Sequence, residues 1–295
     1  MLGLKNLLVG VIVLFIGSSF CYGESTFYII GDPFDPIVRS FLLSLEKADK
    51  KFNYQFVDKI EGEYGFDVAN RVLYLEGQPV SLKYGIKDIM DRYLSERFDA
   101  WKNSYFIVIQ SSSGYAEDVV SLLREKKIGF SLAANNKDVD LVINNKKGEI
   151  GKKKVIFLVA GGENSMYRDL IIPMFFRRVI KNMDIVVLAE HLCGRVMDQD
   201  NMVGLKGVEF YSFVSCLGDD EVKNLAEKID NDYLSAIIGI ESFYFYKNSV
   251  EGNQYVGRFL EKVENNRYNF VLNGYVVMGD GSLRLLPLVR QIELK

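Results

Sequence analysis

His191 is the only histidine of the 295-residue chain, so acid-base or zinc chemistry would have to be built around it. The sequence has no Gly-x-Ser-x-Gly elbow, no Cys-x-x-Cys pair and no His-x-x-x-His spacing. His191 could serve as the base for one of the serines at 111–113 if folding joined them. A lone histidine beside a strand end is more typical of a structural or ligand-contacting group. The sequence therefore predicts a protein that is not an enzyme, with no catalytic residue, metal site or cofactor.

Polar side chains follow three strand-like segments at the points where those segments end. Ligands of open parallel sheets bind at the carboxyl ends of the strands, where such side chains gather. Helix capping would explain any one of the three clusters alone. Taken together they predict a binding cleft, in which Tyr115, Asn164 and Glu190 are expected to lie side by side. The ligand-binding candidates from these clusters are Ser111, Ser113, Tyr115, Glu163, Asn164, Glu190 and His191.

The elements that must position these residues alternate between short β-rich runs and amphipathic helical patterns. This alternation is typical of an α/β protein with parallel sheets. Strands are predicted over 27–30, 54–57, 72–75, 105–109, 155–159, 185–189, 208–214, 268–277 and 283–294. Helices are predicted over 37–48, 86–94, 119–123, 170–180 and 233–246, loops over 59–70 and 144–154, and a turn over 77–79.

The N-terminus has the pattern of a secretory signal peptide. Lys5 precedes an apolar run over 7–16, and Gly23 offers a small residue at the cleavage position. A lipoprotein anchored at Cys21 is the alternative, which is less favoured because Phe20 stands where a small residue is expected. No later apolar run is long enough to cross a membrane, so we expect a periplasmic protein that begins after Gly23.

Composition and charge narrow the function classes further. The formal net charge is −3 and becomes −4 once Lys5 is removed, which argues against nucleic acid and against anionic membrane surfaces as partners. With 48% hydrophobic residues, about 270 remaining residues can form one large or two medium domains. Cys193 and Cys216 could form a disulfide in an oxidising compartment. Sequence spacing leaves a bridge and two free thiols equally open.

The order of several short motifs resembles one known family. The segment 73–79 looks like a Tyr-x-Gly-x-x-Pro-like turn, 162–168 is similar to a Gly-rich opening of a second-lobe helix, and 273–276 to a closing hairpin. In the loop 108–115 only Ser111 and Tyr115 match the Gly-Ser-Asp-Tyr-x-Tyr-Pro-Arg pattern. These motifs belong to the amide- and urea-binding branch of the branched-chain amino-acid-binding proteins, of the type I periplasmic fold. The resemblance adds Tyr74 to the ligand-binding candidates.

The resemblance implies an α/β fold of two lobes, each a parallel sheet flanked by helices. The first lobe would comprise 24–104 plus about 219–275, and the second 105–218 plus about 276–295. The implied function is that of a solute receptor for an ABC-type importer, which binds a small amide, urea or amino acid and docks on the importer's membrane subunit. The first lobe is expected to be reduced, because 57–72 has no room for the family's extra strand-helix-strand unit. Binding should then be weak, and the alternative is a degenerate member that serves as a cell-envelope protein-interaction module.

Overall fold

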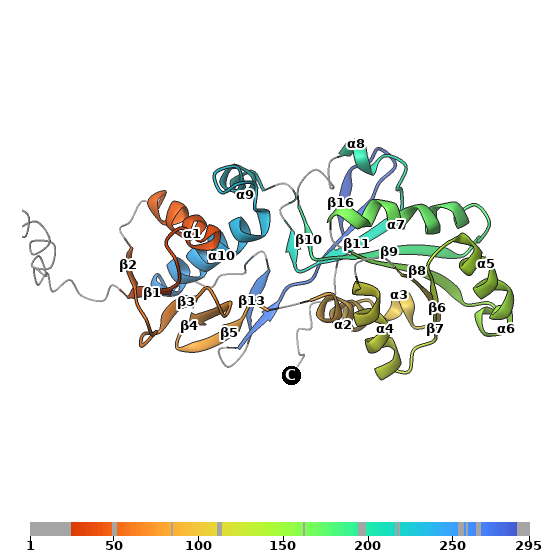
Figure 1. Ribbon diagram of the computed structural model, residues 1–295, viewed down its shortest axis with the longest axis horizontal. Helices are drawn as coiled ribbons and strands as arrows, with labels where there is room; N and C mark the ends of the chain where they lie inside the picture. Colours follow the sequence, from red (N-terminus) through yellow and green to blue (C-terminus); the bar gives the residue numbers. More distant parts are fainter. Residues whose placement is uncertain are drawn as a thin grey trace, which may run out of the picture.

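The computed structural model describes residues 25–48, 52–83, 85–110, 114–161, 163–193, 199–215, 217, 219–252, 257, 259–263 and 267–287. Side chains at 163–167, 199, 261–263 and 267–268 are outside the description. The chain forms two α/β lobes that lie side by side along the longest axis of the molecule (Figure 1). None of the helices in the described part is both long enough and apolar enough to cross a membrane.

The first lobe is built on a five-stranded sheet in the order β2-β1-β3-β4-β5. The first three strands of that order run parallel, and β3, β4 and β5 pair antiparallel. Its strands are β1 (Thr26–Ile30), β2 (Asn53–Phe56), β3 (Tyr64–Asp67), β4 (Val72–Leu75) and β5 (Gln78–Ser81). Its helices are α1 (Pro36–Glu46), α9 (Asp220–Ala226) and α10 (Tyr233–Val250).

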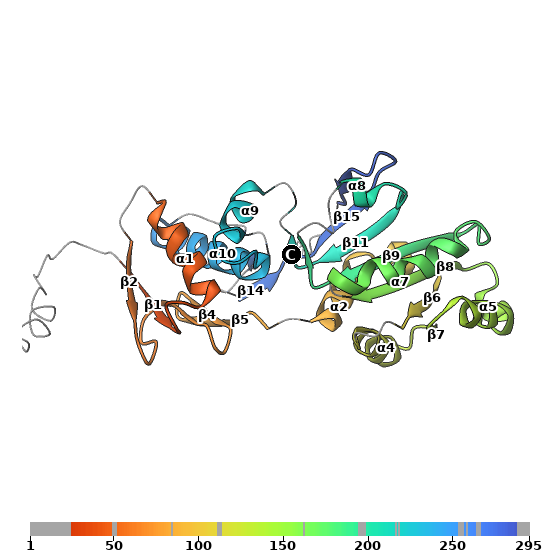
Figure 2. The same ribbon diagram turned by 45° about the horizontal axis from the view of Figure 1, so that its top comes forward.

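The helices of the first lobe cover one face of its sheet. Asp35 starts α1, because its side chain accepts the N–H of Ile37 at 2.8 Å and Pro36 occupies the first turn. The rings of Phe27 on β1 and Phe41 on α1 stack with centroids 4.4 Å apart. Alternate residues of β1 and β4 are buried against these helices, which leaves the other side of the sheet half-buried. The lobe therefore has a single core on one side of its sheet (Figure 2).

The second lobe contains a seven-stranded sheet in the order β16-β15-β11-β9-β8-β6-β7. Its five strands from β11 to β7 run parallel, and β15 and β16 add an antiparallel edge. Its strands are β6 (Ser104–Ile109), β7 (Phe130–Ala133), β8 (Lys154–Gly161), β9 (Met183–Ala189), β11 (Val208–Ser212), β15 (Asn273–Val277) and β16 (Leu283–Leu285). Its helices are α2 (Ile86–Glu96), α3 (Phe98–Trp101), α4 (Tyr115–Glu125), α5 (Asn136–Asn145), α6 (Lys147–Ile150), α7 (Glu163–Phe176) and α8 (Gln199–Met202).

Helices cover both faces of the second-lobe sheet. Phe157 on β8 faces the core that includes residues of α5 and α7, and the next residue, Leu158, faces the core that includes residues of α2 and α4. Strands that are buried on both faces appear in a sequence as continuous apolar runs. This explains why the strands at 105–109, 155–159 and 185–189 were predictable from such runs.

The chain passes between the lobes at three places: between β5 and α2, between β12 and α9, and between β14 and β15. Two small ladders lie near these passages, β10 (His191–Leu192) with β12 (Val214–Ser215) and β13 (Leu260–Val263) with β14 (Arg267–Phe270). Cys193, next to β10, is disulfide-bonded, and Cys216 lies outside the described residues. A disulfide between Cys193 and Cys216 therefore stays a prediction.

The helix α2 packs against the second-lobe sheet. Its residues Ile89 and Tyr93 are buried in one core with residues of β6 and α4. The β15–β16 hairpin likewise joins the second-lobe sheet from residue 273 onward. The predicted lobe boundaries, 24–104 plus about 219–275 and 105–218 plus about 276–295, stay predictions.

Three predicted local structures are wrong. The predicted loop at 59–70 contains β3, which lies between β1 and β4 in the sheet. The predicted turn at 77–79 is shorter, since β5 already begins at Gln78. The predicted loop at 144–154 contains the end of α5 and all of α6. As expected, residues 57–72 hold no strand-helix-strand unit, but they do supply one more strand than predicted.

Candidate functional site

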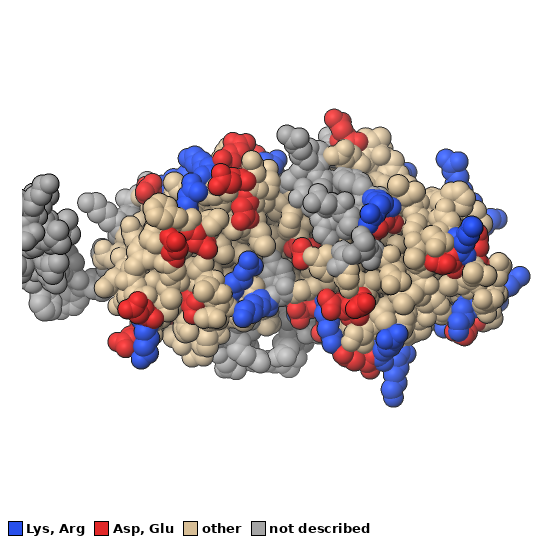
Figure 3. All heavy atoms as spheres, in the orientation of Figure 1, with Lys and Arg blue, Asp and Glu red and all other residues tan. Residues whose placement is uncertain are grey.

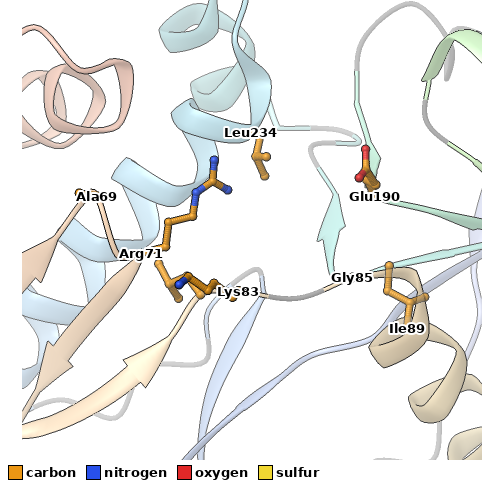
Figure 4. Close-up of a pocket in the computed structure, with 8 residues that line it drawn as sticks. Ala69, Arg71, Lys83, Gly85, Ile89, Glu190 and Leu234 are labelled. Atoms are coloured by element: carbon orange, nitrogen blue, oxygen red, sulfur yellow. The ribbon is translucent and has the colours of Figure 1, made fainter. Parts of the chain in front are cut away.

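A pocket of about 370 Å³ lies between the two lobes. This volume falls within the range of small-molecule sites, and the pocket is neither enclosed nor flat. The close-up in Figure 4 shows Arg71 and Lys83 on the first-lobe side and Glu190 on the second-lobe side. The lining residues are Ala69, Arg71, Leu82, Lys83, Gly85, Ile89, Glu190 and Leu234.

The β3–β4–β5 meander sets the two cations of the pocket side by side. Arg71 enters β4 with a positive φ of 52°, a conformation uncommon for a residue with a side chain. The turn before it is tied by the Asp67 carboxylate, which accepts hydrogen bonds from the backbone and side-chain nitrogens of Asn70. The N–H of Leu82 then donates to the carbonyl of Arg71 at 2.8 Å. This bond closes the base of the β4–β5 hairpin, so Lys83 follows next to Arg71.

Glu190 occupies the opposite wall, directly after β9. The Tyr115 hydroxyl at the start of α4 lies close to the Glu190 carboxylate. Burial, together with the interaction with the Glu190 carboxylate and its charge, raises the pKa of Tyr115 to about 12. The carbonyl of Glu190 accepts a hydrogen bond from Ser212 Oγ at 3.0 Å, which fixes the backbone at the strand end. The acid is therefore held by the second lobe.

The charges across the junction have opposite signs. In Figure 3 basic atoms gather on the first-lobe side of the junction and acidic atoms over α2 on the second-lobe side. Within the pocket two cations face a single carboxylate, so its net charge is positive. Such a pocket can bind an anionic group by charge-assisted hydrogen bonds. The described part of the chain contains no group of three or more acidic, cysteine or histidine residues that could hold a metal ion.

The structure brings together only some of the predicted site residues. Tyr115 and Glu190 contact each other, and Glu190 lines the pocket. His191 follows on β10 and is half-buried, and its buried Nδ1 has no hydrogen-bond partner among the described residues. Tyr74 lies on the side of the first-lobe sheet that faces away from the helices, because its neighbours Leu73 and Leu75 form the core.

Four of the predicted residues cannot be placed. Ser111 and Ser113 lie outside the described residues. Glu163 and Asn164 begin α7, but their side chains are outside the description. The shared cleft of Tyr115, Asn164 and Glu190, and ligand binding by all eight candidates, therefore stay predictions.

The two cations, Arg71 and Lys83, were missed by sequence reasoning. They flank a hairpin, whereas the prediction considered only the carboxyl ends of parallel strands. A basic residue at each end of 71–83, around the strand-turn-strand pattern, was the available signal. This part of the first lobe supplies charge to the junction although the larger strand-helix-strand unit is absent.

The comparisons with known proteins concern structure only, since no protein-family model and no curated protein matches the sequence. The structure of Haemophilus influenzae LpoA aligns with 90% of this chain at 10% identity and a TM-score of 0.60. This chain spans 59% of that LpoA chain. The match to the separate C-domain of LpoA, described as a regulator of PBP1A, covers 89% of this chain and 99% of the domain, at 11% identity and a TM-score of 0.55.

The chain has the fold of the LpoA C-domain. A leucine-binding protein, LivK from Thermotoga maritima, aligns with 92% of the chain and 100% of its own length at 10% identity, but its TM-score of 0.43 carries no argument. The predicted fold class is confirmed: the molecule is a two-lobed α/β protein of the type I periplasmic-binding-protein-like fold. At such low identities the likeness establishes the fold and leaves function to the site.

Proposed function

We propose that this chain is an exported protein-interaction module of the cell envelope, which binds a partner protein at the junction of its two lobes. The observation that carries the proposal is the construction of the pocket. Its first-lobe wall combines the two ends of the β4–β5 hairpin with Ala69 and Leu234, and its second-lobe acid lies beside Tyr115. A site of this kind is open at its rim, where a protein surface can reach it. The LpoA C-domain, a regulator of PBP1A, supports the same class of function.

The charge of the pocket specifies the contact that the partner makes. An aspartate, glutamate or terminal carboxylate of the partner would lie between Arg71 and Lys83, where each charge-assisted hydrogen bond contributes about 1.5–3 kcal/mol. The apolar side chains of Ala69, which is exposed, and Leu234, which is half-buried, would pack beside it. This pattern, a charged anchor within an apolar surround, is a common arrangement of a protein interface.

Cross-linking in cells of the source organism tests the proposal. A photoreactive residue at Ala69, which lines the pocket and is exposed, should capture one defined envelope protein, and the double variant Arg71→Gln/Lys83→Gln should lose that product. Lys59→Gln is the matched control, because its side chain lies on the same lobe, is 79% exposed and is outside the pocket. Equal capture by the double variant and the control would contradict the proposal.

A solute receptor is the second candidate, and the charges of the pocket favour an amino acid as its ligand. The carboxylate of a zwitterion would face the two cations and its ammonium group would face Glu190. Calorimetric titration with amides, urea and aliphatic amino acids separates the two candidates. We expect no binding or weak binding, and a sub-micromolar dissociation constant for any of these solutes would favour the receptor.

A further inference from the structure

The outer side of α7 presents three large apolar side chains to solvent. Ile171 is 66% exposed, Phe175 is 59% exposed, and Val179, in the turn after the helix, is 70% exposed. The N–H of Ile180 donates to the carbonyl of Phe176 at 2.9 Å, so the helical path continues through this turn. Residues four apart on a helix are neighbours on its surface, and the three side chains therefore form one stripe.

The opposite side of α7 already holds the helix on the second lobe. Leu170 and Phe176 are each 2% exposed, and the ring of Phe176 stacks on that of Phe157 with centroids 6.2 Å apart. Figures 1 and 2 show α7 lying along the second-lobe sheet. The exposed stripe is therefore not needed to dock α7 on its own lobe. A surface helix with apolar residues on its outer side as well needs another explanation.

The exposed charges on this segment are basic. Arg168 precedes the stripe with 64% of its side chain exposed, and Arg178 and Lys181 are exposed at its other end. The acidic residue of 168–181, Asp169, is 5% exposed and lies 3.7 Å from Arg168. A stripe of apolar side chains with cations at both ends complements a surface that is apolar inside and anionic outside.

We infer that residues 168–181 form a docking surface for an anionic lipid bilayer. Helices that lie in a membrane interface combine an apolar face with basic residues beside it, and they need no shape complementarity. A protein interface of standard size uses about 20–30 residues on each side, far more than this stripe offers. The net negative charge of the whole chain does not decide membrane binding at this surface. Salt screens distant charges, so an adjacent bilayer interacts mainly with the basic residues of this segment. Docking here leaves the pocket and its proposed partner untouched.

Co-sedimentation with lipid vesicles tests this surface. The mature chain should bind vesicles of phosphatidylglycerol and phosphatidylethanolamine, bind neutral phosphatidylcholine vesicles less, and lose binding as salt rises. The triple variant Ile171→Ser/Phe175→Ser/Val179→Ser should lower the partition coefficient by about tenfold or more. Reversing two charges in Arg178→Glu/Lys181→Glu should have a similar effect, again about tenfold or more.

Leu141→Ser is the matched control, since Leu141 is 58% exposed on α5 of the same lobe. It should leave vesicle binding unchanged, and circular dichroism should show that all variants are folded. The inference is overturned if the wild-type chain does not bind the anionic vesicles, as expected if a protein covers the stripe. It is equally overturned if the α7 variants bind as well as Leu141→Ser does.

Discussion

The two lobes differ in how deeply they bury adjacent residues of a strand. On β8 of the second lobe, Phe157 and Leu158 point to opposite faces and both are fully buried. On β1 of the first lobe, Phe27 is fully buried while Tyr28 is half-buried. The reason is that helices cover both faces of the second-lobe sheet and one face of the first. The comparison shows that the second lobe has three layers and the first lobe has two, and that the pocket lies where they meet.

The largest effect should come from truncating either residue of the second-lobe pair. Phe157→Ala should lower the free energy of unfolding by about 3–5 kcal/mol and Leu158→Ala by about 2–5 kcal/mol, because each leaves a cavity in a packed core. Denaturant unfolding provides the measurement, with Leu141→Ala as the exposed control. If Leu158→Ala behaved like that control, the second lobe would not be buried on both faces.

The first-lobe pair should respond unequally. Phe27→Ala removes a ring stacked on Phe41 and should cost about 3–5 kcal/mol. Tyr28→Ala acts on the side of the sheet without helices and should cost about 1 kcal/mol, the central value for point mutations. The same unfolding experiment measures both variants. Equal losses for the two would show that some element also covers the outer side of this sheet.

A smaller loss of unfolding free energy is expected at the contact between α10 and α1 in the first lobe. A Cβ at Gly239 would stand 2.5 Å from the Cβ of Ser40 and 2.7 Å from the backbone nitrogen of Phe41. Because the backbone of α1 cannot move away without disturbing the packing, Gly239→Ala should lower the unfolding free energy by about 1–3 kcal/mol. The control is Gly148→Ala in α6, where a Cβ meets nothing within 4 Å. A neutral Gly239→Ala would mean that the single core of the first lobe is loosely packed.

The smallest effect concerns the acid that the second lobe contributes to the pocket. The pKa of Tyr115, about 12 in the folded chain, lies above the ordinary tyrosine value of about 10. Between these values the folded state binds more protons than the unfolded state. The contribution of Tyr115 to the free energy of unfolding is therefore complete below pH 10 and is lost as the pH rises to about 12. Tyr115→Phe should flatten the fall of the unfolding free energy in that window, and the exposed Tyr54→Phe should not. An unchanged slope in Tyr115→Phe would show that the pKa of Tyr115 is not raised in the folded chain.

The order of strands and helices was largely predictable because most second-lobe strands are continuous apolar runs. The strand β3 was missed, since Tyr64-Gly65-Phe66-Asp67 is short and contains a glycine, and its burial comes from its place between β1 and β4. The strand β5 was missed because Pro79 suggests a turn, although proline is tolerated on an edge strand such as this one.

Sequence reasoning considered only one side of the pocket. Parallel strand ends indicated Tyr115 and Glu190, of which Glu190 lines the pocket, and ligand binding by both stays a prediction. Arg71 and Lys83 depend on the register of a hairpin and on how the two lobes meet. Sequence periodicity contains neither piece of information, so the positive charge of the pocket appears only in the folded molecule.

The first lobe is built from two separate stretches of the chain, which are synthesised at different times. Its sheet comes from residues 26–81, but α10, which covers that sheet, begins at residue 233. At synthesis rates of about 5–20 residues per second, the start of α10 follows the end of β5 by roughly 8–30 seconds. During that interval the central strands of the second lobe can already pack. The apolar side chains of Phe27, Phe41 and Leu73 are not yet covered by α10. The sheet whose strands are made first is therefore covered late, and its uncovered apolar face is the segment that most needs protection from aggregation in a newborn chain.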